Sequence, residues 1–369
     1  MNRPFSVYLD LVRFIAAFLV YLYHSNQRFL TESILPASDY GHSSVMVFFV
    51  LSGFVIAFVT ATKENTWVSY SASRMARVFS VTVPAIFLTV FLDAIGRNLY
   101  PEIYSGYPYD KFILRIGSSL AMLNEVWLLS ITSFSNVPYW SICYEWWYYV
   151  TFAMISFLPL RIGIPLAIMI LLLIGPKLIL LAPIWWLGVL LYRWRRLQDL
   201  SIRWSVLFLV ISVIGVVVYH ASGFSDITTS LLKMVLGEEL HRSLTFSKFF
   251  VGDYFLGVLV FLNFAGARNI LATYGDFLLS IEKPVRFLAN YTFTLYLLHQ
   301  PLFLFWGAVI QGDPSGPWYW LTVTALMLLS IAIVGHFTEN RRKSIRDFLI
   351  FLFARYFPDK TWATTSKAG

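Results

Sequence analysis

The sequence contains little charge and a single cysteine. Cys143 is the only cysteine in 369 residues, which excludes an intramolecular disulfide and any metal site built from several cysteines. Charged residues make up 13% of the chain and hydrophobic residues 58%, with a mean hydropathy of +0.68. A soluble globular domain has about 25% charged residues. The composition therefore indicates an integral membrane protein.

Ten apolar stretches, each bounded by charged or turn residues, predict an all-α polytopic protein with about ten transmembrane helices. They lie near residues 7–23, 43–60, 78–92, 138–158, 162–176, 178–192, 204–220, 249–265, 287–310 and 318–338. Residues 112–130 carry Arg115, Asn124 and Glu125, so we interpret them as an interfacial or re-entrant segment. The first apolar stretch shows no small-residue cleavage pattern, and we expect it to remain in the mature chain.

Loops that are rich in basic residues alternate along the chain with loops that contain few. With ten spans and a cytoplasmic N-terminus, 19 of the 28 Lys and Arg residues fall on the cytoplasmic side and 8 on the opposite side, while Arg13 lies within a span. This bias is the positive-inside pattern of a protein with both termini in the cytoplasm. The net charge of +8 then reflects topology and lipid contact, and we expect no nucleic-acid partner.

We divide the chain into a membrane domain, residues 1–340, and a basic amphipathic cytoplasmic tail, residues 341–369. The tail begins with Arg341, Arg342 and Lys343 and continues into the apolar run 348–353. Such a segment is typical of a helix that lies on the inner leaflet. We found no internal repeat, low-complexity tract or soluble domain.

Two ionisable residues lie in or at the end of the first apolar stretch. Arg13 and His24 are eleven residues apart, so on a helix they project from nearly the same face, about 16 Å apart along the axis. A charge inside a span costs several kcal/mol unless it finds a partner or reaches the interface. One groove could hold both side chains; alternatively, Arg13 extends to the near interface beside Asp10.

Three further features need an explanation. Arg74 and Arg77, in the link before the third span, share a helix face and could clamp a phosphate, although the positive-inside rule also explains them. Glu145 lies about two turns into the fourth span, where a carboxylate must pair, be protonated or face water. In the second span, the small pair Ser52 and Gly53 favours close helix packing.

A second histidine within a span, His299, comes directly before a Gln-Pro pair whose proline should kink the helix and open a cavity. On its own, such a residue is usually a satisfied core histidine. A haem held by two of His24, His299 and His336 is an alternative, but it leaves Arg13 and Glu145 without a role. The histidines, acidic residues and single cysteine show no metal-ligand spacing.

Taken in order, these motifs resemble acyltransferase family 3, membrane proteins that acylate envelope polysaccharides and related sugars. The resemblance spans residues 9–301. It rests on the stretch from Leu9 to Arg13 with ten residues before His24, the Ser52-Gly53-Phe54 stretch, the Arg74-x-x-Arg77 pair, Trp140-Ser141 with Glu145, and Tyr296-Leu297-x-His299. Larger family members carry an extracytoplasmic esterase-like domain, and we expect this chain to be the stand-alone form.

The resemblance implies an acyl-CoA donor, usually acetyl-CoA, bound on the cytoplasmic side by Arg74, Arg77, Arg13 and Ser52. Its implied acceptor is a carbohydrate hydroxyl, its location the bacterial inner membrane, and a polysaccharide-biosynthesis complex is a further candidate partner. We expect His24 to act as general base, with Arg13, Glu145 and His299 as the other catalytic residues and Glu145 orienting a histidine or sharing charge with Arg13. No metal is expected.

Two other functions remain open on sequence grounds. A transporter or flippase for a sugar or lipid-linked glycan would also line its path with intramembrane charges. Such proteins often contain inverted repeats, which are not evident in this chain. A purely structural membrane scaffold gives no role to Arg13 or Glu145.

Overall fold

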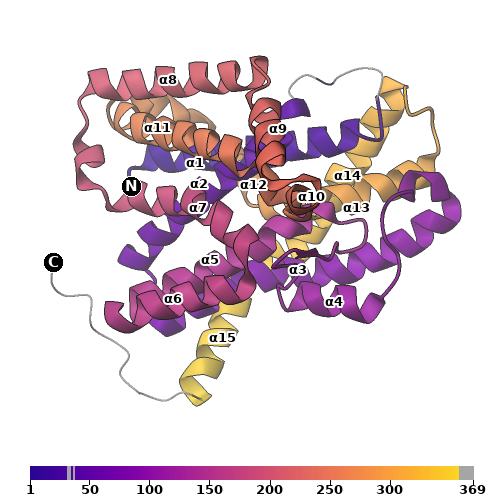
Figure 1. The fold of residues 1–369 in the computed structure, drawn as a ribbon, viewed down its shortest axis with the longest axis horizontal. Helices are drawn as coiled ribbons and strands as arrows, with labels where there is room; N and C mark the ends of the chain where they lie inside the picture. Colours follow the sequence, from indigo (N-terminus) through magenta and orange to yellow (C-terminus); the bar gives the residue numbers. More distant parts are fainter. Residues whose placement is uncertain (31–34, 36–37, 357–369) are drawn as a thin grey trace.

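The computed structural model describes residues 1–30, 35 and 38–356. Nearly all of its regular structure is helical (Figure 1). The helices are α1 (Arg3–Asn26), α2 (Gly41–Thr62), α3 (Trp67–Leu99), α4 (Phe112–Leu120), α5 (Trp140–Phe157), α6 (Leu160–Ile174), α7 (Pro176–Arg193), α8 (Ile202–Ala221), α9 (Phe224–Leu236), α10 (Glu238–Ser243), α11 (Phe250–Tyr274), α12 (Glu282–Ala289), α13 (Thr292–Ile310), α14 (Pro317–Phe337) and α15 (Arg342–Tyr356). Two short antiparallel strands, β1 (Glu125–Val126) and β2 (Leu129–Ser130), form a hairpin.

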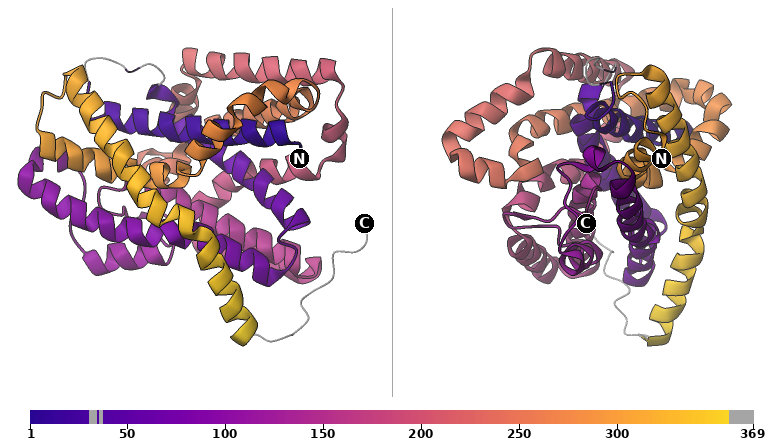
Figure 2. Two further views of the ribbon diagram at one scale, coloured as in Figure 1. Left: turned by 180° about the vertical axis from the view of Figure 1, so that it is seen from behind. Right: turned by 90° about the vertical axis from the view of Figure 1, so that its right-hand side faces the viewer.

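Each of the ten predicted spans contains a helix, which confirms the all-α polytopic class. In the described residues, eight helical segments are long and apolar enough to cross a membrane. Helices α5 and α6 are not among them, and α6 has only 15 residues, a length of about 22 Å. Several long helices, among them α1, α3 and α8, run roughly along the longest axis of the molecule, whereas α14 crosses it obliquely (Figures 1 and 2).

Two predicted boundaries were wrong. Helix α3 begins at Trp67, so Arg74 and Arg77 lie inside this helix and not in a link before it. The predicted span began near residue 78 because the charged residues before it lower the local hydropathy. The helix itself begins earlier, at a capping box between Thr66 and Ser69. The predicted span 287–310 is interrupted: α12 ends at Ala289 and α13 begins at Thr292.

The segment 112–130 contains no helix long enough to span a membrane. It consists of the nine-residue α4 and the β-hairpin. A fully buried ion pair between Lys177 and Glu125 fixes the hairpin to α7, and Ser130 also donates to Glu125. Burial raises the pKa of Glu125 despite the nearby ammonium group, because the carboxylate has lost its hydration.

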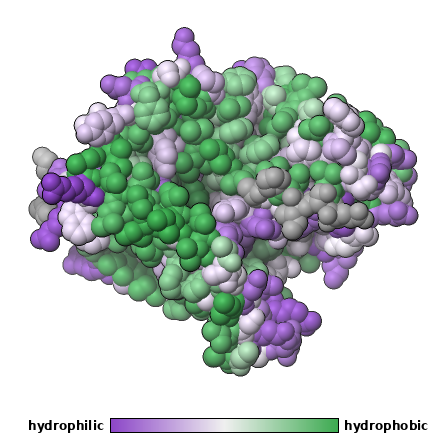
Figure 3. Space-filling view, turned by 90° about the horizontal axis from the view of Figure 1, so that it is seen from above, coloured by the Kyte–Doolittle hydropathy of each residue, from purple (hydrophilic) through white to green (hydrophobic). Residues whose placement is uncertain are grey.

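The ends of α1 contact segments that were predicted to lie on the same side of the membrane. Arg3 forms an ion pair with Glu282 at 2.6 Å. At the other end of the helix, Arg28 donates to the carbonyl of Ser105 at 2.9 Å. Seen from above, much of the surface is apolar, and hydrophilic residues lie at both ends of the long axis, near the centre and on the part that projects at the bottom of the view (Figure 3). An apolar surface of this extent is expected for a bundle that crosses a bilayer.

Helices α2 and α7 approach closely at two glycines. A Cβ atom on Gly53 would lie 2.0 Å from the carbonyl oxygen of Trp185, and one on Gly188 would lie 2.0 Å from that of Val50. Only glycine leaves room for this backbone contact. The packing interpretation of the Ser52–Gly53 pair is therefore confirmed for Gly53, and the contact holds α2 in place where it lines the site described next.

Candidate donor pocket and histidine pair

A pocket with about 690 Å³ of empty space, part of it open to the surface, lies between α1, α2, α3, α5 and α13. Its lining joins segments far apart in the sequence, and its polar side chains come from every one of these helices. They are Arg13, Ser52, Arg74, Arg77, Ser141, Glu145, Tyr149, Thr292, Tyr296 and Glu339. Five of the seven predicted site residues therefore meet in one cavity; His24 and His299 are outside this lining.

Three arginines supply the positive charge of the pocket. Arg13 pairs with Asp10 at 2.7 Å, as the interface alternative anticipated, but it is only 20% exposed and faces the pocket. Arg74, 9% exposed, donates to both carboxylate oxygens of Glu64 at 2.8 Å. Arg77 lies one turn after Arg74, over the ring of Phe293 at 5.9 Å. All three arginines therefore line one pocket, and Arg74 and Arg77 lie one turn apart on α3.

Glu145 has different partners from those expected. It accepts a hydrogen bond from Ser52 at 2.7 Å and another from Tyr149, and its charge interacts with that of Arg77. The expected contact with a histidine or with Arg13 is not among the hydrogen bonds and ion pairs of the described residues. Because Glu145 and Ser52 lie on different helices, their hydrogen bond joins α5 to α2 at the pocket wall.

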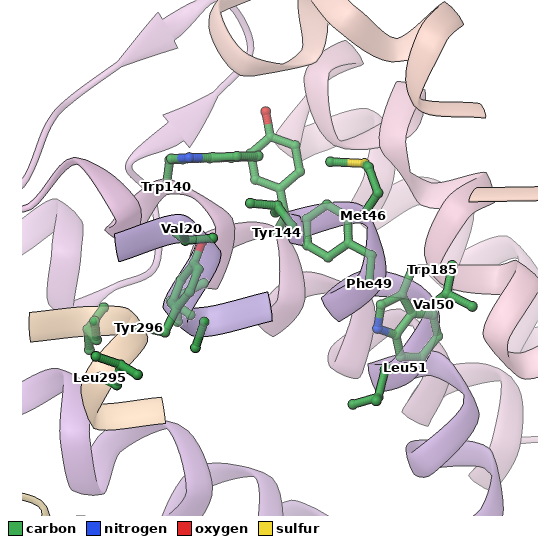
Figure 4. Packing of buried hydrophobic residues seen from close by; sticks show 14 of the residues in the cluster. Val20, Met46, Phe49, Val50, Leu51, Trp140, Tyr144, Trp185, Leu295 and Tyr296 are labelled. Atoms are coloured by element: carbon green, nitrogen blue, oxygen red, sulfur yellow. The ribbon is translucent and has the colours of Figure 1, made fainter. Parts of the chain in front are cut away.

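The inner wall of the pocket is formed in part by Tyr296. Its hydroxyl hydrogen-bonds Ser141 at 2.6 Å, and its ring lies against Phe48 at a centroid distance of 5.2 Å. Figure 4 shows Tyr296 on α13 and, on α5 nearby, Trp140 and Tyr144 within the buried aromatic core. The motif residues Tyr296 and Ser141 thus contact each other, although 155 positions separate them in the sequence.

His24 and His299 form a pair behind this wall. Nδ1 of His24 lies 2.9 Å from Nε2 of His299, and His299 is completely buried. His299 follows Tyr296 by one turn of α13, with ring centroids 6.4 Å apart. Two ring nitrogens at 2.9 Å leave no room for a metal between them, since metal–nitrogen distances are about 2 Å. This contact contradicts a haem ligated by His24 and His299.

The hydrogen bonds of the pair determine its tautomers. Nδ1 of His299 is 3.0 Å from the carbonyl of Leu295, which can only accept, so this nitrogen carries the proton. Nε2 of a neutral His299 is then an acceptor, and Nδ1 of His24 must donate to it. Nε2 of His24 is left with a free lone pair, the form that a general base requires.

Sequence reasoning missed three polar residues of the pocket: Glu339, Tyr149 and Thr292. Glu339 accepts from the backbone and the hydroxyl of Thr294, both at 3.0 Å. It lies in a short 3-10 helix, η7 (Glu339–Arg341), between α14 and α15. Tyr149 lies one turn after Glu145. A carboxylate directly after an apolar span was a signal for Glu339, whereas Tyr149 was hidden among the aromatic residues of its helix.

The structure is an all-α membrane bundle with a pocket lined by three arginines and an adjacent histidine pair, which defines the chain as a polytopic membrane protein. The family model described as an acyltransferase domain matches residues 6–336. The chain therefore belongs to acyltransferase family 3 and is a membrane acyltransferase. No curated protein and no solved structure gave a significant match. In the described residues, no group of three His, Cys, Asp or Glu side chains could hold a metal ion.

Proposed function

We propose that the protein transfers an acyl group, most simply acetyl, from cytoplasmic acyl-CoA to a hydroxyl of a cell-envelope or exported sugar, in the bacterial inner membrane. The observation that carries the proposal is the convergence of Arg13, Arg74 and Arg77 on one pocket whose inner wall adjoins the His24–His299 pair. Guanidinium groups bind phosphates through paired hydrogen bonds. Family membership favours this function over a transporter.

In this mechanism the phosphates of CoA lie near the arginines and the pantetheine arm extends past Glu145 toward Tyr296. The thioester must pass this wall to reach the histidine pair, so the Tyr296 side chain turns aside or the arm passes beside it. If the side chain turns aside, the hydrogen bond between Ser141 and Tyr296 breaks. The pocket is lined by both polar and aromatic side chains, which suits an extended ligand with a charged head and a less polar arm.

His24 performs the proton transfer. Its Nε2 takes the proton from the acceptor hydroxyl while that oxygen attacks the thioester carbonyl carbon. The tetrahedral intermediate collapses with cleavage of the C–S bond, and the departing CoA thiolate recovers the proton from the His24 imidazolium. The products are the acylated sugar and CoA, so no other reactant is needed. His299 fixes the His24 tautomer by accepting from Nδ1.

The test is acetyl-CoA binding to the detergent-solubilised protein, measured by thermal shift. We expect ligand-dependent stabilisation in the wild type and its loss in Arg77→Ala and in the double variant Arg74→Ala, Arg77→Ala. Arg77 is the safer single change because, in the described residues, it takes part in no ion pair, whereas Arg74 holds Glu64. Removing a charge-assisted contact costs about 1.5–3 kcal/mol, or roughly ten- to hundredfold in affinity.

The matched control is Arg195→Ala, Arg196→Ala, which removes two exposed arginines predicted to lie on the same side of the membrane. This variant should keep the stabilisation. If millimolar acetyl-CoA does not stabilise a well-folded wild type, the proposed donor is contradicted. That result would favour a transport function.

A further inference from the structure

Arg342 is the first residue of α15 and lies just beyond the pocket. It follows the pocket-lining Glu339 by three positions, and η7 connects the two. Helix α15 continues beyond α14 and extends past the bundle (Figure 2). It packs along α3, the helix that carries Arg74 and Arg77. The start of the predicted cytoplasmic tail is thus part of the surroundings of the pocket.

The charges around Arg342 are mostly of its own sign. Its guanidinium interacts electrostatically with Arg77, Arg13 and Arg74, and only Glu339 opposes this repulsion. Arg13 and Arg74 have carboxylate partners in Asp10 and Glu64. In the part of the chain that the structure describes, Arg77 and Arg342 form no ion pair within 4.0 Å. Gathering cations in this way costs energy unless an anion binds between them.

The shape of CoA decides which of its phosphates Arg342 can reach. The thioester lies at one end of the molecule, and the adenosine, with its 3′-phosphate and 5′-diphosphate, lies at the other. If the thioester points toward the histidine pair, the diphosphate falls near Arg74 and Arg77 within the pocket. The 3′-phosphate then lies further out, where the side chain of Arg342 is accessible.

We propose that Arg342 is a donor-site residue whose guanidinium binds the 3′-phosphate of acyl-CoA, so that the site distinguishes CoA from 3′-dephospho-CoA. The inference rests on the proposed acyl-CoA donor and deepens it. It gives the start of α15 a role in ligand recognition in addition to membrane anchoring. The other basic residues of α15 have no part in it.

The experiment compares the dissociation constants of acetyl-CoA and 3′-dephospho-acetyl-CoA for wild type, Arg342→Gln and Lys343→Gln. Wild type should bind acetyl-CoA about tenfold more tightly than the dephospho compound, the effect of one charge-assisted phosphate contact. Arg342→Gln should bind both ligands alike, at the wild-type affinity for the dephospho compound. Lys343 is the matched control, since it is the next basic residue, is also exposed, and projects about 100° away around the helix.

The outcomes separate the two proposals. Retained discrimination in Arg342→Gln, or an equal loss in Lys343→Gln, overturns the role of Arg342 while leaving the donor site intact. A wild type that binds both compounds equally well does the same. Failure of wild type to bind either compound contradicts the proposed function itself. Arg342→Gln removes an exposed side chain, and an unchanged melting temperature without ligand would show that the variant folds.

Discussion

At the residue scale, the direct contact between His24 and His299 is the feature with the clearest chemical consequence. Neither histidine lines the arginine pocket, yet their ring nitrogens share a hydrogen bond. Because His299 donates to the carbonyl of Leu295, His24 is the donor in the bond between the two rings. A lone buried histidine is usually a packing residue. Here it positions a second imidazole, which is how carboxylates and carbonyls orient catalytic histidines in other enzymes.

This arrangement predicts different effects for the two histidines. His24→Ala should lower acyl transfer by a factor on the order of 10²–10⁴, the usual contribution of a general base. His299→Leu should also lower kcat strongly, because Nδ1 of His24 loses its side-chain acceptor, while the KM for acetyl-CoA should hardly change. His299→Gln, which can still accept at that position, should recover part of kcat. The measurement is transfer of radiolabelled acetyl groups to envelope polysaccharide in membranes.

His336→Ala provides the control for these variants, because this histidine is exposed on α14. It should transfer at the wild-type rate. A His24→Ala protein that folds and retains full activity would show that His24 is not the general base. Equal activities of His299→Leu and His299→Gln would show that His299 contributes packing and not a hydrogen bond.

At the element scale, the contact between α2 and α7 positions the pocket. Ser52 and Gly53 are neighbours on α2: Ser52 faces the pocket and donates to Glu145, while Gly53 faces the backbone of α7. Trp185 of α7 also donates to the Ser52 hydroxyl at 3.2 Å. A shift of α2 away from α7 would therefore move one wall of the pocket.

Gly53→Ala should consequently destabilise the protein by several kcal/mol and lower its melting temperature, since the new methyl group would meet backbone atoms that cannot rotate away. Gly117→Ala is the control. Gly117 lies on α4, where a Cβ atom would have no neighbour within 4 Å. There the change should be neutral or stabilising by up to about 1 kcal/mol, because alanine favours a helix. Equal melting temperatures for the two variants would contradict the close contact.

At the scale of the whole molecule, the sequence predicts ten spans with both termini in the cytoplasm. The single cysteine makes this topology easy to test, because Cys143 is fully buried and should not react in the folded protein. Ser105→Cys and Lys343→Cys each add an exposed thiol at opposite predicted sides. A membrane-impermeant maleimide should label Ser105→Cys in intact spheroplasts and Lys343→Cys only after permeabilisation. Labelling of both variants from the outside would overturn the topology.

The sequence also determined much of the membrane architecture. Charge depletion and ten apolar stretches gave the all-α class and the approximate helix positions, since a backbone in hydrocarbon must satisfy its hydrogen bonds within helices. The predicted boundaries of α3 and α13 were wrong because hydropathy contains no information about helix capping or a local break in a helix. For the tail, α15 covers residues 342–356 of the predicted segment 341–369, and residues 357–369 lie outside the described part.

For the site, the sequence identified the residue types whose burial requires a partner: Arg13, Glu145 and the histidines within or at the ends of spans. It also indicated the Arg74–Arg77 pair, because two residues three positions apart share a helix face. Only the tertiary structure decided which of these residues contact each other. Arg13 and His24 share a face of α1, yet one lines the pocket and the other pairs with a histidine 275 positions away. Such pairings depend on how the helices pack against each other, and spacing along one helix carries no information about its neighbours.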